Sequence, residues 1–375
     1  MLPVLVFLAL AAFAAALLGG LPVIGRPATV HLMLAVGAMP LILGAMSHFI
    51  PVLTRTRAAA TGLLSIPVLA LAGGALAVSA FNVSGMMWAR PASALLAAIA
   101  AIALLAWSRH RRAGMLGRPH PGLAWYEAAL ACLVLALLAI LVGTFWPQHK
   151  LSLRRLHLHL NTLGFIGLTA MGTLAVLLPT AAGRPDPQIA ERLRRNLPWA
   201  VSGVLLIATG SAWFAPLAWV GAALWVVPIS RLAASWLRLY RAEILALHGA
   251  APLLAAALTG LVISVVLGAV NAFYPTEPTW SFVTGFMLPL VSGAASQLLP
   301  VWLRPGVQSD WHAKLRRSLG RYNGFRAVIF CGGGIAAGMG WEWGLLISLA
   351  ALIWFLLQTC TALASALFFQ KRNPS

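Results

Sequence analysis

Residues 157–179 read HLHLNTLGFIGLTAMGTLAVLLP, a stretch of helical length that is largely apolar after two histidines at its start. His157 and His159 are two residues apart, a rotation of about 200° on an α-helix, so the two imidazoles face opposite flanks of the helix. Ionisable side chains are costly within a bilayer, and their presence there indicates a function. The stretch therefore predicts a membrane helix that can serve a separate site on each flank.

The composition extends this prediction to the whole chain. Of its 375 residues, 61% are hydrophobic and 9% are charged, and the mean hydropathy is +0.90. Apolar runs of about 20 residues, the length of a membrane helix, recur throughout. Because a helix satisfies its own backbone hydrogen bonds in lipid, we predict an all-α integral membrane protein in contact with the lipid bilayer. The twelve predicted spans are 2–20, 30–53, 60–82, 89–107, 123–145, 156–180, 197–215, 217–237, 244–271, 279–303, 325–341 and 343–369.

The net charge of +19 is distributed unevenly over the loops. Of the 26 Lys and Arg residues, 21 lie after even-numbered spans or at the C-terminus. The five in the odd-to-even loops are Arg26, Arg90, Lys150, Arg154 and Arg155. By the positive-inside rule, this asymmetry predicts a bacterial-type inner (cytoplasmic) membrane protein with both termini in the cytoplasm. Anionic lipids account for the basic loops, so we expect no nucleic-acid partner.

A pattern of three residues recurs in the second, sixth and tenth predicted spans. A glycine follows the first position by 13 residues, and a proline follows it by 20. The three sets are His31, Gly44 and Pro51; His159, Gly172 and Pro179; and Trp280, Gly293 and Pro300. Equivalent residues four spans apart indicate an internal repeat. We therefore predict a single membrane domain, 1–375, built from three four-helix repeats at about 1–107, 108–238 and 239–375.

The same spacing predicts the depth of the histidines. Twenty residues of α-helix rise about 30 Å, which is the thickness of the hydrocarbon layer. The three prolines precede basic loops, so His31, His157 and His159 are expected near the opposite, outer face. Imidazoles at that depth can bind heme iron or copper, although a histidine there can also hydrogen-bond to a neighbouring helix.

The twelve spans and the His157-x-His159 motif resemble subunit I of the heme–copper oxidase superfamily. In that family such a helix holds two hemes, one on each flank, and a histidine of an equivalent helix completes a six-coordinate heme. The resemblance implies that His31 and His159 bind a b-type heme and that His157 faces a second site. The sequence departs from the family because it contains no His-His pair, so the copper ligands cannot be transferred and oxygen reduction is not expected.

The stretch from His31 to Arg55 is also similar to the smaller, oxidase-related NnrS-like membrane proteins, which are associated with heme, copper and the nitric oxide response. This resemblance implies a heme-binding or heme- and copper-binding protein in nitric oxide response or respiratory electron transfer. An activity on a diatomic gas, as a heme-dependent oxidoreductase, is then expected, together with an electron-donor subunit or a respiratory complex as partner.

Two other groups of residues are candidates for function. His48, His248 and Met46 form a candidate second metal site, because imidazole and thioether ligands suit Cu(I). That site favours the alternative function of copper transport, or of an assembly subunit for a respiratory complex. Asn161 is a candidate supporting residue beside the histidines, or an interhelical hydrogen bond, and Trp280 can pack on a porphyrin or belong to the aromatic belt.

Overall fold

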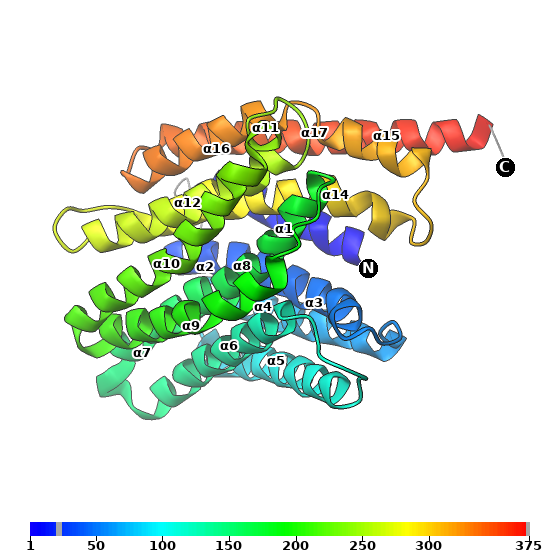
Figure 1. Ribbon diagram of the computed structural model, residues 1–375. Helices are drawn as coiled ribbons and strands as arrows, with labels where there is room; N and C mark the ends of the chain where they lie inside the picture. Colours follow the sequence, from blue (N-terminus) through cyan, green and yellow to red (C-terminus); the bar gives the residue numbers. More distant parts are fainter. Residues whose placement is uncertain (20–24, 373–375) are drawn as a thin grey trace. The chain divides into compact units, whose positions relative to one another are not determined.

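The computed structural model describes residues 1–19 and 25–372, and for 367–372 it describes the backbone alone. Every regular element in this part of the chain is a helix, which confirms the all-α class. The α-helices are α1 (Leu2–Gly19), α2 (Arg26–His31), α3 (Met39–Thr54), α4 (Ser65–Asn82), α5 (Ala89–Ala113), α6 (Gly122–Phe145), α7 (Lys150–His159), α8 (Leu168–Ala181), α9 (Ile189–Trp213), α10 (Ala215–Leu239), α11 (Arg241–Ile244), α12 (Ala251–Val270), α13 (Pro278–Ser281), α14 (Leu288–Leu303), α15 (Asp310–Leu319), α16 (Asn323–Gly338) and α17 (Trp343–Arg372) (Figure 1). Short 3₁₀ turns are η2 (Thr61–Leu64), η3 (Met86–Trp88) and η4 (Pro147–His149).

Nine helical stretches within the described residues are long and apolar enough to cross a membrane. They are Arg26–Thr54, Thr61–Asn82, Met86–Ala113, Gly122–Phe145, Pro147–Ala181, Ala215–Leu239, Ala251–Val270, Pro278–Leu303 and Trp343–Ala366. The other three predicted spans coincide with α1, α9 and α16. The first of these was predicted to reach Gly20, which lies outside the described residues. Helix α16 has only 16 residues, which is short for a membrane span, and α9 begins with a charged first turn. Neither helix is therefore among the nine long apolar stretches.

Three of the long spans change from α to π geometry near their beginning. The π-helical segments are η1 (Leu32–Ala38), η5 (Leu160–Gly167) and η6 (Phe282–Met287). The span predicted over 156–180 is therefore α-helical up to His159 and π-helical for the next eight residues. A π segment is a rare departure from the α-helix that occurs frequently at functional sites. Each segment begins one or two residues after the first position of the repeated pattern.

Each π segment packs against the membrane helix that precedes it: η1 against α1, η5 against α6, and η6 against α12. Further along the same spans, the repeated glycines pack against those same helices. A Cβ on Gly44 would lie 2.7 Å from a Leu5 methyl, and one on Gly172 would lie 2.8 Å from the Cβ of Trp125. On Gly293 it would lie 3.0 Å from the Cβ of Leu253. Glycine at these positions lets the helix backbones approach closely.

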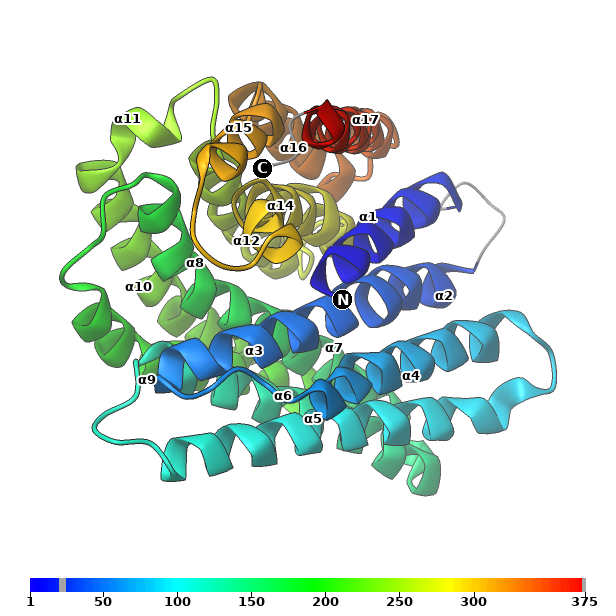
Figure 2. The ribbon, with the colours of Figure 1, turned by 90° about the vertical axis from the view of Figure 1, so that its right-hand side faces the viewer.

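The chain divides into two compact units. Unit 1 comprises 1–175 and 186–231, and unit 2 comprises 176–185 and 232–375. Within unit 1, α4 and α5 lie side by side as a hairpin, and α6 packs on α5 (Figure 2). Within unit 2, α12 packs against η6, α14 and α16, and α17 packs on α16. Most of the first two predicted repeats falls in unit 1, and the third falls in unit 2.

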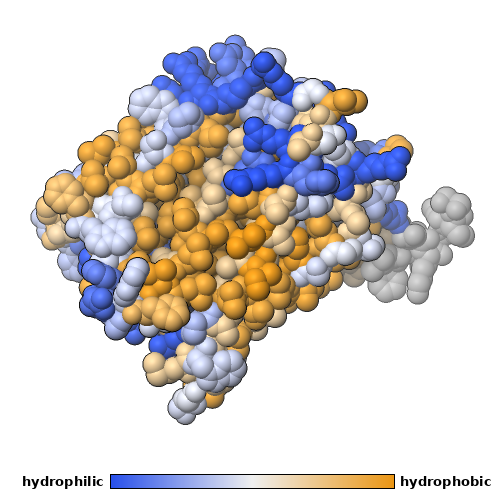
Figure 3. Space-filling view, turned by 90° about the horizontal axis from the view of Figure 1, so that it is seen from below, coloured by the Kyte–Doolittle hydropathy of each residue, from blue (hydrophilic) through white to orange (hydrophobic). Residues whose placement is uncertain are grey.

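The surface is consistent with a lipid environment. The face in Figure 3 is hydrophobic over most of its area, and hydrophilic side chains gather at its margins. Large apolar side chains are exposed on the outer sides of α5 and α6, among them Leu95, Ile99, Ile102, Leu135 and Leu138. Exposed apolar surface of this extent is typical of a protein that contacts lipid. The apolar helices and this surface together indicate a membrane protein.

Candidate functional site

Two histidines from distant parts of the sequence meet inside unit 1. His31 is the last residue of α2, and His157 lies in the last turns of α7. Their ring centroids are 6.5 Å apart, and the ring planes are inclined by only 14°. Both side chains are half-buried. Two imidazoles trans to each other on one metal ion, each at about 2 Å from it, have centroids about 6 Å apart. The spacing of His31 and His157 fits one shared metal.

The hydrogen bonds of these rings determine which nitrogen is available. The Nδ1–H of His31 donates to the carbonyl of Pro27 (2.7 Å), and that of His157 donates to the carbonyl of Ala136 on α6 (2.9 Å). A carbonyl oxygen can only accept, so the proton of each neutral ring is on Nδ1. The lone pair of each ring is then on Nε2. A backbone carbonyl that holds the second nitrogen is the usual partner of a metal-binding histidine.

The surroundings of the pair come from three elements, η5, α4 and α5. Asn161, one turn after His157, donates from Nδ2 to the His157 carbonyl (3.0 Å), and its Nδ2 also lies 3.4 Å from Nε2 of the ring, the nitrogen that can accept. On the other side, the Phe81 ring of α4 lies 4.7 Å from the His31 ring. The guanidinium of Arg90 on α5 lies over Phe81 at 4.8 Å. Asn161 was expected beside the histidines, whereas nothing in the sequence singled out Phe81.

His159 has a different environment from His157. Its Nδ1–H donates to the carbonyl of Arg155 in its own helix (2.9 Å), and its Nε2 forms no hydrogen bond within the described residues. The partner expected for His31 was His159, but the ring beside His31 is that of His157. The α-helical rotation of 200° still separates the two rings, because α7 remains α-helical as far as His159. Which flank of α7 faces α2 depends on tertiary packing, which the repeat pattern does not report.

The candidate second metal site is not assembled within unit 1. Met46 is fully buried in α3, whereas His48, two residues later, is exposed, because the two side chains face opposite sides of the helix. His248 belongs to unit 2, and its Nδ1 accepts a hydrogen bond from the backbone N–H of Tyr322 (3.1 Å). In the neutral ring of His248 the proton is then on Nε2, which removes the lone pair that a metal would need.

Trp280 lies in α13 in unit 2, and its side chain is half-buried. It precedes η6 as His31 precedes η1 and His159 precedes η5. No group of three or more His, Cys, Asp or Glu side chains suited to a metal ion occurs in the part of the chain that the structure describes. The His31–His157 pair would therefore need further ligands from the bound group itself, as a porphyrin provides.

Comparison of the chain with models of protein families, with curated proteins and with solved structures finds no match. The class that the fold and the site define is an all-α protein of membrane-spanning helices with a paired-histidine site in unit 1.

Proposed function

We propose that the protein is a multi-pass membrane protein that binds a b-type heme through Nε2 of His31 and Nε2 of His157. The observation that carries the proposal is the 6.5 Å spacing of two nearly parallel rings whose Nδ1 atoms are both held by backbone carbonyls. Heme iron is well suited to a site with only two protein ligands, because the porphyrin supplies the other four.

The residues around the pair fit the parts of a heme. Phe81 offers an aromatic face next to His31, and Asn161, whose Nδ2 lies 3.4 Å from Nε2 of His157, would turn aside when that nitrogen binds iron. Arg90 is a cation beside Phe81, and its Nε is buried without a hydrogen-bond partner among the described residues. A heme carries two anionic propionates at its polar edge. A cation beside the histidine pair that still has a free N–H donor, such as Arg90, could hydrogen-bond to a propionate. Trp280 belongs to the other unit and has no role in this site.

The repeated architecture supports the resemblance to oxidase subunit I that the sequence carries. In each predicted repeat, a π segment follows the first position of the pattern, packs on the preceding helix, and is followed by a glycine that contacts that same helix. We infer twelve spans in three repeats, with α1, α9 and α16 as the three spans that are shorter or more polar. We also infer an inner-membrane location with both termini in the cytoplasm, as the distribution of charge favours.

A bound heme, held by His31 and His157, would supply reversible one-electron transfer and an iron that can interact with a diatomic gas. The chain's own contribution is to orient both rings by their Nδ1–H bonds and to surround them with apolar helices. We propose a role in the nitric oxide response or in respiratory electron transfer, with an electron-donor subunit as partner. His159, on the other flank of α7, is available for a copper ion.

The copper-handling alternative has less support. It depends on His48, Met46 and His248, and the opposite orientations of Met46 and His48 do not favour a shared ion. Copper could also bind to the His31–His157 pair in place of heme. Metal analysis of the purified protein distinguishes copper from heme iron at this site.

The test is the visible spectrum of purified protein from heme-replete cells, reduced minus oxidised. We expect a Soret band in the wild type that is lost in both His31→Ala and His157→Ala. His159→Ala is the matched control, since it removes an imidazole from the same helix and should keep the band. A spectrum without heme absorption in the wild type would overturn the proposal. A band lost in His159→Ala but kept in His157→Ala would instead restore the His31–His159 pairing.

A further inference from the structure

An arginine in unit 2 is buried with no counter-ion in the described part of the chain. Arg326 lies in the first turn of α16, and its side chain is 0% exposed. Within the described residues it forms no ion pair. The sequence offers no acidic neighbour either, because the stretch between Asp310 and Glu342 contains five cations and no carboxylate. A guanidinium cannot lose its proton at physiological pH, so the buried charge must be stabilised in another way.

The contacts of Arg326 leave much of its hydrogen-bonding capacity unused. Nη2 donates to the carbonyl of Arg321 and to Oε1 of Gln358 (3.2 Å), whereas Nε and Nη1 have no partner among the described residues. The rings of Trp354 and Phe355 on α17 lie 4.9 and 5.2 Å from the guanidinium carbon. Cation–π contacts compensate part of the charge, but they satisfy none of the free N–H groups.

The neighbouring polar side chains are also incompletely paired. Asn323 is 0% exposed, and its Nδ2 donates to Gly249 O (2.8 Å) and to Ser296 Oγ (3.1 Å). Its Oδ1 has no partner among the described residues, and neither has the hydroxyl of the buried Ser292. Unpaired polar atoms in a buried cluster are costly and call for a ligand or water. Gln358 is half-buried and holds Nη2, so it is the side chain that an incoming anion would displace.

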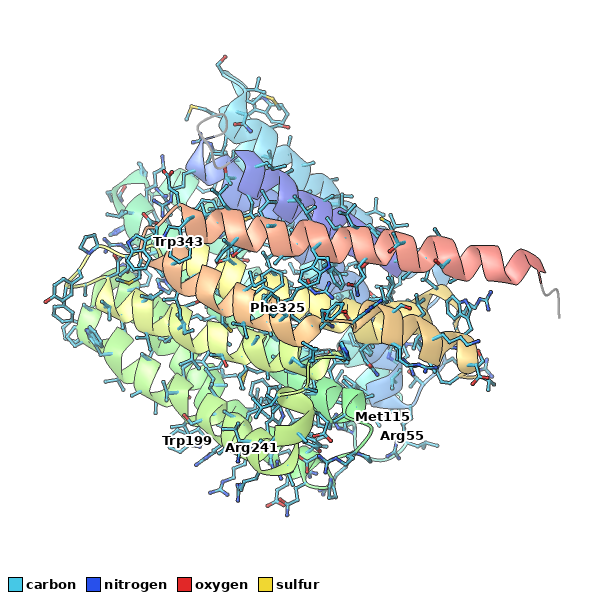
Figure 4. All side chains as sticks on the ribbon, turned by 90° about the horizontal axis from the view of Figure 1, so that it is seen from above. Arg55, Met115, Trp199, Arg241, Phe325 and Trp343 are labelled. Carbon is cyan, nitrogen blue, oxygen red and sulfur yellow. The ribbon has the colours of Figure 1, made fainter. Side chains whose placement is uncertain are left out.

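The adjacent helix α15 has the character of a helix at the membrane surface. Leu315 and Leu319 pack with Leu299 of α14, and Leu363 of α17 lies against them. The opposite side carries exposed Lys314 and Arg317. An amphipathic helix with a basic outer face lies in the lipid headgroup region and attracts anionic lipids. Phe325, next to Arg326, is 59% exposed on α16 (Figure 4), as expected for a residue that contacts acyl chains.

The geometry points to a phosphate-binding site for an anionic lipid, formed by Arg326 with α15 and the turn that joins α15 to α16. The headgroup phosphate displaces Gln358 and accepts hydrogen bonds from Nε and Nη2 of Arg326, whose N–H groups point to the same side of the guanidinium, and Lys314, Arg317 and Arg321 supply the surrounding positive field. Guanidinium and phosphate match in charge and geometry, which favours this anion over a halide. The inference concerns unit 2 and does not depend on heme binding in unit 1.

The test uses full-length protein delipidated in a neutral detergent. Phosphatidylglycerol, phosphatidylcholine and inorganic phosphate are added separately, and the unfolding temperature is measured. We expect phosphatidylglycerol to raise Tm by about 5 °C in the wild type and by less than about 1 °C in Arg326→Gln. Arg238→Gln, which removes an exposed arginine elsewhere in unit 2, should retain the full shift. An equal shift with inorganic phosphate, also lost in Arg326→Gln, would identify free phosphate as the source of the same chemistry.

Two results would overturn the site. One is an undiminished phosphatidylglycerol shift in Arg326→Gln, and the other is an equal shift with zwitterionic phosphatidylcholine in the wild type. If Arg326→Gln does not fold, two other variants take its place: Arg326→Lys, and Arg317→Gln, which changes an exposed residue. Arg326→Lys keeps the charge but loses the guanidinium donors, and Arg317→Gln weakens the surrounding field. Both are expected to reduce the shift at least twofold, and unchanged shifts in both would contradict the proposal.

Discussion

At the scale of single residues, the three histidines near the predicted outer face share one feature. His31, His157 and His159 each donate from Nδ1 to a backbone carbonyl, so the lone pair of each neutral ring is on Nε2, and that of His157 lies 3.4 Å from Asn161 Nδ2. Two of these carbonyls, those of Pro27 and Arg155, are four residues earlier in the same helical segment. The third belongs to Ala136 on another helix, which makes His157 the ring whose orientation depends on packing between helices.

A fourth histidine, outside the membrane helices, should make stability depend on pH. His120 lies between α5 and α6, and its Nδ1 accepts from the backbone N–H of Gly122 (3.1 Å). Burial lowers the pKa of His120 below its usual value of 6.5, and the charges of Arg194 and Arg55 lower it further. Because the unfolded chain then binds the proton more tightly, the stabilisation by the neutral ring is present above about pH 6.5 and is lost as the pH falls below it.

We therefore expect the advantage in Tm of the wild type over His120→Gln to shrink between about pH 7.5 and about pH 5. Thermal unfolding in detergent at a series of pH values measures it. His110→Gln changes an exposed histidine of the same region and serves as the control. A difference between wild type and His120→Gln that stays constant with pH would show that His120 does not titrate in this way.

At the scale of elements, π segments and glycines together give three spans the same construction. The glycine contacts differ in how much they can relax. The atom nearest to an added Cβ on Gly44 is the end of the flexible Leu5 side chain, but the one nearest to Gly172 is the Cβ of Trp125. Trp125 is 1% exposed, and its indole N–H donates to Leu193 O (3.1 Å), so it cannot move aside easily.

Gly172→Ala should accordingly destabilise the protein by about 1–3 kcal/mol, the usual cost of overpacking a tight contact. Gly62→Ala is the matched control, because an added Cβ there meets no atom within 4 Å, and its effect should be within about 0.5 kcal/mol. Unfolding of both variants in detergent compares them. Equal stabilities would mean that α6 and α8 separate without cost and that the close approach is unimportant.

At the scale of the whole molecule, the distribution of charge predicts a membrane orientation that can be tested in unit 1. Leu116 lies in a basic loop after the fourth predicted span and is 96% exposed. Met87 lies in the loop before that span and is 65% exposed. In a background in which the three native cysteines are alanine, we expect Met87→Cys in intact cells to react with a membrane-impermeant maleimide. Leu116→Cys should react only after the cells are opened, and the reverse pattern would invert the topology.

The candidate site was only partly predictable from the sequence. The sequence singled out the histidines and placed Asn161 beside them, because His157, His159 and Asn161 are close together in one span. The contacts of Phe81 and Arg90 with this site were not predicted from the sequence. Both come from the α4–α5 hairpin, which is distant in the sequence. That Arg90 is one of only five cations in the outer loops was the one available signal for it.

The sequence by itself determined the all-α class, the membrane-length helices and the repeated pattern. These depend on hydropathy, helix length and residue spacing, which are local properties of the chain. Only the tertiary structure decided that His157 lies beside His31, that π geometry begins directly after His159, and that Arg326 is buried with no counter-ion among the described residues. Helical rotation separates His157 and His159 whatever surrounds them, but which of the two faces His31 depends on how α2, α6 and α7 pack together.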